Sequence, residues 1–279
     1  MNSPKCLGVR IGSVEFGTST FPVIAGPCSV ESEEQFATSL ILAQAAGAAC
    51  IRGGLKKMRT KPDSFQGLGR DGVPFVLKAL KNNPLPFVSE ITDPRDLEWM
   101  DEVVDAYQIG TRNMYNYDLL KEVGRCKKPV ILKRAFSAYI DEWIHAAEYI
   151  ARTGNTQIIL CERGIRSFEP RLRNTLDLGA VAYLKANADF PVIVDPSHAT
   201  GDRDFVEPMA LAAAAAGADG LLIEAHPNPR LAYSDAQQAL DFESLGRLMN
   251  RLEKLLNSQG RELYRNTGGV ISLRKELHT

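Results

Sequence analysis

The sequence predicts a single (β/α)8 barrel, and three observations lead to that fold. Short runs rich in Val and Ile alternate with helical segments along the chain, and eight such pairs can be counted. Several of these runs are apolar throughout, which is typical of parallel strands buried on both faces. The 279 residues show no break in composition, and one barrel of this type commonly has about 250 residues.

The pattern places each element in turn. We expect the eight strands at 23–26, 50–52, 87–90, 106–110, 130–134, 157–163, 192–197 and 220–226. We expect the helices that separate them at 33–47, 74–82, 94–104, 116–125, 138–153, 171–188, 203–217 and 234–256. Ser32 is a suitable N-cap for the first helix, and Pro94 and Pro170 stand at helix starts, where a missing N–H is tolerated. Glycines such as Gly47 and Gly217 follow helices and indicate their C-terminal ends.

Short segments flank the barrel at both ends. A small hairpin at about 7–20 would close the bottom of the barrel, and a polar tail at about 257–279 includes the segment ISLRKEL. We expect residues 1–279 to form one catalytic domain without a regulatory domain, and the tail to be a contact in a homo-oligomer, a dimer or a tetramer.

Composition restricts the class of partner and the compartment. The chain has 33 basic and 34 acidic residues, so it lacks the basic bias of proteins that coat nucleic acid or bind membrane surfaces. No apolar run is long enough to span a membrane, and residues 1–10 show no signal peptide. The five cysteines are odd in number, widely spaced and without a C-x-x-C motif, which indicates a reducing compartment. We therefore expect a cytoplasmic protein without nucleic-acid or membrane partners.

Residues that could hold a metal follow three adjacent strands. Chemistry in this fold lies at the C-terminal ends of the strands. Cys28 follows the first strand, while His198 and Glu224 follow the seventh and eighth, and barrel closure makes these strands neighbours. Asp235 is expected at the start of the last helix, within reach of the same rim. A thiolate, an imidazole and two carboxylates form a ligand set that accepts Mn²⁺, Fe²⁺, Co²⁺ or Zn²⁺, and we expect Mn²⁺.

The opposite sector of the rim is basic. Its cations come from strands two, four, five and six and from the loop after strand two: Arg52, Lys57, Arg59, Arg112, Lys133 and Arg163. Several cations that face one cavity require an anion to neutralise them, and arginine matches phosphate and carboxylate in two-point contacts. We therefore expect a ligand with more than one anionic group. The glycine-rich turns match neither the P-loop nor the dinucleotide fingerprint, so a nucleotide is not indicated.

These residues lie in long motifs that together resemble a known enzyme family. The motifs are AGPCSVES (25–32), RGGLKKMRTKPDSFQGLG (52–69), IGTRNMYNYDLLKEVG (109–124), LCERGIRSFE (160–169), DPSHATGDRD (195–204) and EAHPNP with Ser234–Asp235. They resemble 3-deoxy-D-arabino-heptulosonate 7-phosphate (DAHP) synthase in its short bacterial and archaeal branch. The resemblance runs from about residue 8 to 245. The related 3-deoxy-D-manno-octulosonate 8-phosphate (KDO8P) synthase shares the fold and the chemistry.

The resemblance implies a function for each group of residues. It implies a metal-dependent transferase that condenses phosphoenolpyruvate with erythrose 4-phosphate in the first step of the shikimate pathway. The implied metal ligands are Cys28, His198, Glu224 and Asp235. The implied substrate-binding residues are Arg52, Lys57, Arg59, Thr60, Arg112, Lys133, Glu162 and Arg163. Arg59 and Thr60 resemble the pair that holds the aldose phosphate group. The expected catalytic residues are Lys133, Lys57, Glu90 and Asp195, with Lys133 as the candidate proton donor.

The chain departs from the family pattern where the aldose is recognised. The usual K-P-R-T-S reads K-M-R-T-K at 57–61, and Ala135 stands where the family has Gly. The octulosonate branch carries an extra residue between the Lys and the Arg, and this chain has none, which favours the four-carbon aldose. A paralogue that uses another aldose phosphate, in specialised metabolism or as an octulosonate-type synthase, is the alternative within this chemistry.

Two readings from other classes make different predictions. A catalytically silent barrel that serves as an assembly partner should have lost a metal ligand, but all four candidates are present. A metal-dependent hydrolase barrel typically has His-x-His after strand one, where this chain has Gly26, Pro27 and Cys28. Feedback-regulated members of the family usually carry an added domain, so we expect no inhibition of this chain by phenylalanine or tyrosine.

Overall fold

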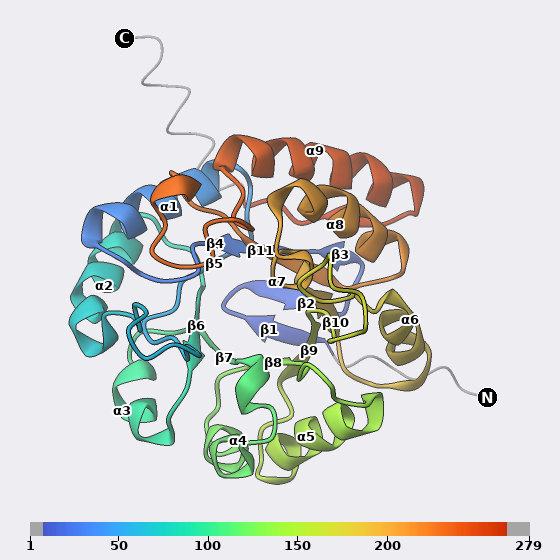
Figure 1. Ribbon diagram of the computed structural model, residues 1–279, viewed down its shortest axis with the longest axis horizontal. Coiled ribbons are helices and arrows are strands. Elements are labelled where there is room, and N and C mark those ends of the chain that lie inside the picture. Colours follow the sequence, from blue (N-terminus) through green and yellow to red (C-terminus); the bar gives the residue numbers. More distant parts are fainter. Residues whose placement is uncertain (1–7, 267–279) are drawn as a thin grey trace.

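The computed structural model describes residues 8–266 and contains a closed barrel of eight parallel strands (Figure 1). The barrel strands are β4 (Val23–Gly26), β5 (Cys50–Arg52), β6 (Phe87–Ile91), β7 (Ala106–Ile109), β8 (Val130–Lys133), β9 (Ile158–Glu162), β10 (Val192–Val194) and β11 (Gly220–Glu224). Closure occurs where β11 pairs with β4, from Leu221 opposite Val23 to Glu224 opposite Gly26. The predicted fold class is therefore confirmed, and the last and first strands are neighbours, as the metal argument required.

Helices surround the barrel, and each follows a strand (Figure 1). They are α1 (Glu33–Ala45), α2 (Val73–Asn82), α3 (Leu97–Met100), α4 (Tyr117–Gly124), α5 (Ile140–Arg152), α6 (Leu178–Asn187), α8 (Val206–Ala215) and α9 (Phe242–Ser258), with the short α7 (Pro196–Thr200) in the loop after β10. Five 3-10 turns precede helices or shape loops: η1 (Gly69–Gly72), η2 (Pro94–Asp96), η3 (Thr111–Asn113), η4 (Arg203–Phe205) and η5 (Pro229–Leu231). Ser32 caps α1 by accepting the N–H of Gln35, as its position predicted.

Two helices begin later than the sequence pattern indicated. The expected helix 171–188 begins at Leu178, because Asp177 is its N-cap and the preceding segment folds back through the bridge between Ile165 and Thr175. The expected helix 234–256 begins at Phe242, capped by Asp241. The predicted start of a helix at Asp235 is therefore wrong. The element expected at 94–104 is also shorter and ends at Met100.

The N-terminal mouth of the barrel is closed by the predicted hairpin, made of β1 (Val9–Ile11) and β2 (Val14–Phe16). Figure 1 shows the hairpin in the middle of the ring of strands. Its side chains form one buried apolar cluster with inward-facing residues of the strands, including Ile24, Ile131 and Ile159. The hairpin therefore supplies the lower layer of the barrel interior, and the polar residues are left to the opposite mouth.

The segment after α9 returns to the start of the chain. Strand β12 (Glu262–Leu263) pairs in parallel with β3 (Thr20–Phe21), and the guanidinium of Arg261 lies 5.2 Å from the ring centre of Phe21. The predicted ISLRKEL segment lies outside the described residues. None of the helices formed by residues 8–266 is long and apolar enough to cross a membrane.

Candidate active site

A cavity of about 430 Å³ opens at the C-terminal mouth of the barrel. Its walls come from the loops after β5, β7, β8 and β9 and from α7, so the strand ends supply most of its polar groups. Side chains of both expected sectors reach it: His198 and Asp235 on one side, and Lys57, Arg112 and Lys133 among the cations. The two sectors inferred from strand order therefore share one cavity.

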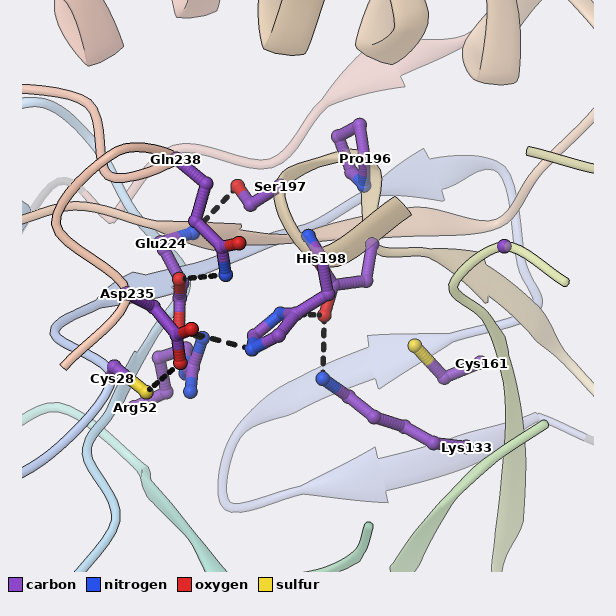
Figure 2. A network of polar contacts seen from close by, with 12 residues as sticks. Cys28, Arg52, Lys133, Cys161, Pro196, Ser197, His198, Glu224, Asp235 and Gln238 are labelled. Atoms are coloured by element: carbon purple, nitrogen blue, oxygen red, sulfur yellow. Dashed lines mark hydrogen bonds and ion pairs between the residues drawn. The ribbon is translucent and has the colours of Figure 1, made fainter. Parts of the chain in front are cut away.

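The four candidate metal ligands come together at one edge of this cavity (Figure 2). One donor atom from each of Cys28, His198, Glu224 and Asp235 lies within 4.8 Å of the other three. The Cys28 thiol donates to Asp235 Oδ2 at 3.0 Å, and His198 Nε2 lies 3.1 Å from Glu224 Oε1. A soft sulfur, an imidazole nitrogen and carboxylate oxygens at this spacing can converge on a single divalent ion.

Asp195 orients the imidazole of His198. As the N-cap of α7, it accepts the backbone N–H of His198 at 2.9 Å through Oδ1, and its Oδ2 lies 2.6 Å from His198 Nδ1. Nε2 therefore turns toward Glu224. Burial favours the neutral acid, but His198 and Lys133 hold the pKa of Asp195 well below its usual range. A carboxylate behind a candidate ligand histidine fixes its tautomer and direction.

The shared environment lowers the pKa of Glu224 and raises that of Cys28. Burial would raise the pKa of Glu224, but the neighbouring His198 and Arg52 hold it well below the usual range. Burial raises the pKa of the Cys28 thiol, and the nearby Glu224 adds to that rise, while Lys57 opposes it. A metal bound here would therefore displace the thiol proton from Cys28.

Asp235 is held in a strained conformation. With φ of 54°, it is the only residue other than glycine at positive φ between residues 8 and 266. Its carboxylate accepts the Cys28 thiol and lies 3.4 Å from Arg173 and 3.6 Å from Arg59. Strain of this type persists only where surrounding contacts enforce it, and it is common at functional sites. The loop, rather than a helix start, therefore places Asp235 beside Cys28.

Most of the predicted cations line the cavity. They are Lys57, Arg59, Arg112, Lys133 and Arg163, and Thr60 and Glu90 line it with them. Lys57 Nζ lies 2.8 Å from Glu90 Oε2, and this pairing opposes the effect of burial: the pKa of Lys57 is raised and that of Glu90 is lowered. Lys133 forms an ion pair with Asp195. Arg163 is buried, and its Nε and Nη1 have no hydrogen-bond partner.

Two predicted substrate contacts do not line the cavity. Arg52 Nη1 donates to Glu224 Oε1 at 3.1 Å, so Arg52 braces a candidate metal ligand. Glu162 accepts from Arg134 at 3.0 Å and from the N–H of Gly164 at 2.6 Å. Successive side chains of a strand point to opposite faces, and Arg163 faces the cavity, so Glu162 faces the surrounding helices. Glu162 therefore lies outside the cavity wall, and its role as a substrate contact stays a prediction.

Several cavity residues were missed by sequence reasoning. Arg173, Gln108 and Phe136 line the cavity, and Gln238 donates to Glu224 beside it (Figure 2). Gln108 could have been found, because it is the only amide in the apolar strand β7. Arg173 could not, since the pattern placed it inside a helix.

Comparison with known proteins agrees with this geometry. A family model, the DAHP synthetase I family, matches residues 9–258. The chain belongs to the DAHP synthetase I family. It is 44% identical over 257 residues to the phospho-2-dehydro-3-deoxyheptonate aldolase of Thermotoga maritima, covering 92% of this chain and 76% of the relative. It is therefore an enzyme of that family.

Other relatives and solved structures place the chain within the wider group. It is 30% identical over 265 residues to a 2-dehydro-3-deoxyphosphooctonate aldolase of Acidithiobacillus ferrooxidans, covering 86% of this chain and 92% of the relative. The crystal structure of the Thermotoga maritima aldolase matches with a TM-score of 0.90 at 43% identity, covering 93% of this chain and 76% of that one. A truncated form of the same enzyme matches with a TM-score of 0.87 at 40% identity, covering 93% and 95%.

Proposed function

We propose that this enzyme condenses phosphoenolpyruvate with erythrose 4-phosphate and releases inorganic phosphate, with the help of a divalent metal. The observation that carries the proposal is the division of one cavity into two sectors. Four donor atoms lie within 4.8 Å of one another on one side, and cations lie on the other, among them the buried Arg163 with two open hydrogen-bond donors. Family membership and the 44% identical aldolase support the same reaction.

Cys28, His198, Glu224 and Asp235 would hold the metal. Their donor atoms fit a single ion in number, chemistry and spacing, and Asp195 and Gln238 support two of them from behind. Bound there, the ion supplies a Lewis acid that polarises the aldehyde oxygen of the aldose. The mixed donor set accepts Mn²⁺, Fe²⁺, Co²⁺ or Zn²⁺, and we propose Mn²⁺ as the native metal.

The cations would hold phosphoenolpyruvate. Arg163 has two open donors in a buried position, so an anion that enters the cavity gains hydrogen bonds without displacing a protein partner. Arg112 and Lys57 lie in the same wall. Holding the carboxylate and the phosphate at separate points fixes the reacting carbon relative to the aldehyde. Arg59 and Thr60, which line the cavity in the same loop as Lys57, would hold the phosphate of the aldose.

Lys133 is the candidate proton donor to the new hydroxyl. Its Nζ pairs with Asp195, whose other contacts go to His198. Asp195 therefore connects the candidate proton donor with a candidate metal ligand, so it can hold both in register while charge develops on the oxygen between them. Glu90 holds Lys57 in the same way on the opposite wall. We therefore propose that the two acids position the two lysines and that the lysines contact the substrate.

The experiment is an aldose-phosphate panel with the purified enzyme. Loss of the enol absorbance of phosphoenolpyruvate is followed with four-, five- and six-carbon aldose phosphates, before and after chelation and with each metal restored. Fastest turnover with erythrose 4-phosphate supports the proposal. Preference for a five-carbon aldose would instead identify an octulosonate-type synthase, a reaction suggested by the 30% identical relatives and by Met58 and Lys61 in the cavity wall. No turnover with any metal would refute the proposed chemistry.

The surroundings of the enzyme follow from the same residues. We propose a cytoplasmic enzyme, because a thiolate ligand at Cys28 requires a reducing compartment, and the four cysteines in residues 8–266 are free. We also propose a homo-oligomer, a dimer or a tetramer, which light scattering of the purified chain would test.

A further inference from the structure

One aromatic side chain lies at the centre of the basic wall. Phe136, in the loop after β8, lines the cavity, and three guanidinium groups surround its ring. The guanidinium carbons of Arg112, Arg163 and Arg166 lie 5.5, 4.8 and 4.8 Å from the ring centre. These arginines belong to the loops after β7 and β9, so one ring connects three consecutive loops of the rim.

The arrangement needs a physical cause, because the three arginines carry like charges. Within residues 8–266, none of the three makes an ion pair with a carboxylate. Arg112 donates to the hydroxyl of Thr60 at 3.1 Å, and the buried Arg163 leaves two donors open. Coulomb repulsion alone would spread such groups apart. The negative face of an aromatic ring attracts cations without accepting their hydrogen bonds, so the N–H donors stay free for a ligand.

The backbone holds the ring where these contacts require it. The N–H of Arg166 donates to the carbonyl of Phe136 at 2.7 Å, which ties the loop after β9 to the loop after β8. Ala135, next to the ring, is buried, and its N–H faces the sulfur of Met114 at 3.2 Å. The ring therefore has little freedom to move away from the arginines. Burial also lowers the pKa of Arg163 to about 10, which shows how weakly other groups stabilise its charge.

We propose that Phe136 is a positioning residue that holds Arg112 and Arg163 in place for the anionic groups of phosphoenolpyruvate. It acts through cation–π contacts, which keep both guanidinium groups in the cavity with their donors open. This inference rests on the proposed function, which it deepens by naming what organises the binding of one substrate. Arg112 also donates to Thr60, so a small secondary effect on the aldose phosphate is expected beside the main effect on phosphoenolpyruvate.

The test is a graded series at position 136 in the metal-loaded enzyme. Phe136→Leu keeps an apolar side chain of similar size without a ring, and Phe136→Trp keeps a ring whose face attracts cations more strongly. Mono-, di- and trifluorinated phenylalanine weaken this attraction stepwise at nearly constant shape. We expect the Kd for phosphoenolpyruvate to rise about 10-fold in Phe136→Leu, from the strength of a cation–π contact. We expect a stepwise rise with fluorination and recovery in Phe136→Trp, with much smaller changes in kcat and in the KM for the aldose phosphate than in the Kd for phosphoenolpyruvate.

Phe65→Leu is the matched control. Phe65 lies on another rim loop, where the centre of its ring is 5.4 Å from that of Tyr233 and no guanidinium of residues 8–266 lies over it. We expect its Kd for phosphoenolpyruvate to equal that of the unchanged enzyme. Wild-type-like binding in Phe136→Leu would overturn the inference, and so would weak binding in Phe136→Leu with no gradient across the fluorinated series, since the ring would then only fill space.

A second probe keeps this inference separate from the proposed function. Inorganic phosphate is titrated in parallel, because it needs the arginines but no condensation. If the unchanged enzyme fails to consume phosphoenolpyruvate, the proposed function fails, yet the dependence of phosphate Kd on the residue at 136 still supports or overturns the role of the ring. If the enzyme is active and neither Kd responds to position 136, only the inference fails.

Discussion

The two mouths of the barrel are built from opposite kinds of residues. At the N-terminal mouth, the hairpin β1–β2 and the inward-facing strand residues form an apolar layer that includes Phe16, Ile24 and Ile131. At the C-terminal mouth, the same strands end in buried charges such as Lys133 and Glu224. Burial of apolar surface stabilises the first mouth, whereas burial of charges at the second costs free energy unless each charge finds a partner. The stabilising apolar layer and the charged candidate site therefore lie at opposite ends of the barrel axis.

The charged mouth limits its cost by pairing. Lys133 contacts Asp195, and Arg52 contacts Glu224, so these charges are compensated in the protein itself. Arg163 is the exception, with two buried donors open. An uncompensated group at such a place is tolerated when function requires it. The contrast between the two mouths predicts three kinds of substitution. Some should lower activity and leave stability unchanged, some should lower stability and leave activity unchanged, and some should raise stability while they weaken substrate binding.

The largest expected effect is loss of the metal site. In Cys28→Ala, activity should fall by at least about 10³-fold, because removal of one ligand from four weakens the ion that the chemistry depends on. Metal content, measured by elemental analysis of the purified protein, should fall in parallel, and the circular dichroism melting curve should change little. Cys50→Ala is the control, since Cys50 is buried in the apolar layer of the opposite mouth and should retain metal and turnover. Full metal content in Cys28→Ala would remove Cys28 from the site.

For Phe16→Ala we expect the opposite result, in which stability falls and activity is retained. Phe16 is fully buried in the layer beneath the strands, so its truncation should lower the free energy of unfolding by about 3–5 kcal/mol. Turnover per folded molecule should be unchanged, because Phe16 belongs to the apolar layer and no residue of the hairpin lines the cavity. Urea unfolding and kinetics at low temperature measure the two quantities on one sample. A large fall in kcat of the folded fraction would show that the two mouths are coupled.

The apolar half of the molecule could be predicted well from the sequence. Runs such as VIAG and GLLIE are apolar throughout, which is typical of strands buried on both faces. The number of strands could therefore be predicted from the positions of these runs along the chain. Neighbouring strand ends then predicted the convergence of Cys28, His198 and Glu224 without any alignment. The resemblance supplied the roles of individual cations.

The loops were predicted less well, for physical reasons. Asp235 and Arg173 lie in segments that read as helix, but caps at Asp241 and Asp177 start the helices later. Their positions depend on tertiary contacts, such as that between Arg173 and Asp235, which no local pattern contains. The sequence pattern did not indicate that Glu162 points away from the cavity that Arg163 lines, because a one-residue step along a strand reverses the side-chain direction. Phe136 was missed because a single aromatic residue in a loop carries no signal until the arginines around it are located.

Substitution of Arg163 should change stability and substrate affinity in opposite directions, with smaller effects than those of the two preceding variants. In Arg163→Met, the free energy of unfolding should rise by about 1–3 kcal/mol, because a buried charge with open donors is replaced by an apolar group of similar length. Affinity for phosphoenolpyruvate should fall at the same time. Arg134→Met is the control: Arg134 is equally buried but paired with Glu162 and Asp177, so its removal should destabilise the protein. Destabilisation by Arg163→Met would mean that Arg163 has a structural role.

The smallest expected effect tests how the metal-site loops hold each other. Ser29 and Ser234 form a buried hydroxyl–hydroxyl hydrogen bond at 3.0 Å, next to Cys28 and Asp235 respectively. Ser29→Ala should weaken metal affinity by about fivefold, since a lost hydrogen bond of about 1 kcal/mol leaves the Ser234 hydroxyl unsatisfied. Ser234→Ala should weaken it less, because the Ser29 hydroxyl still reaches Glu31 Oε1 at 3.4 Å. The double variant should be no worse than Ser29→Ala, because the unsatisfied hydroxyl of Ser234 is then absent. Ser39→Ala, whose hydroxyl bonds only within α1, should leave metal affinity unchanged. Additive losses in the double variant would instead mean that each serine acts on its own loop, and the two loops would then be held together by other contacts, such as Cys28 with Asp235 and Glu31 with the N–H of Tyr233.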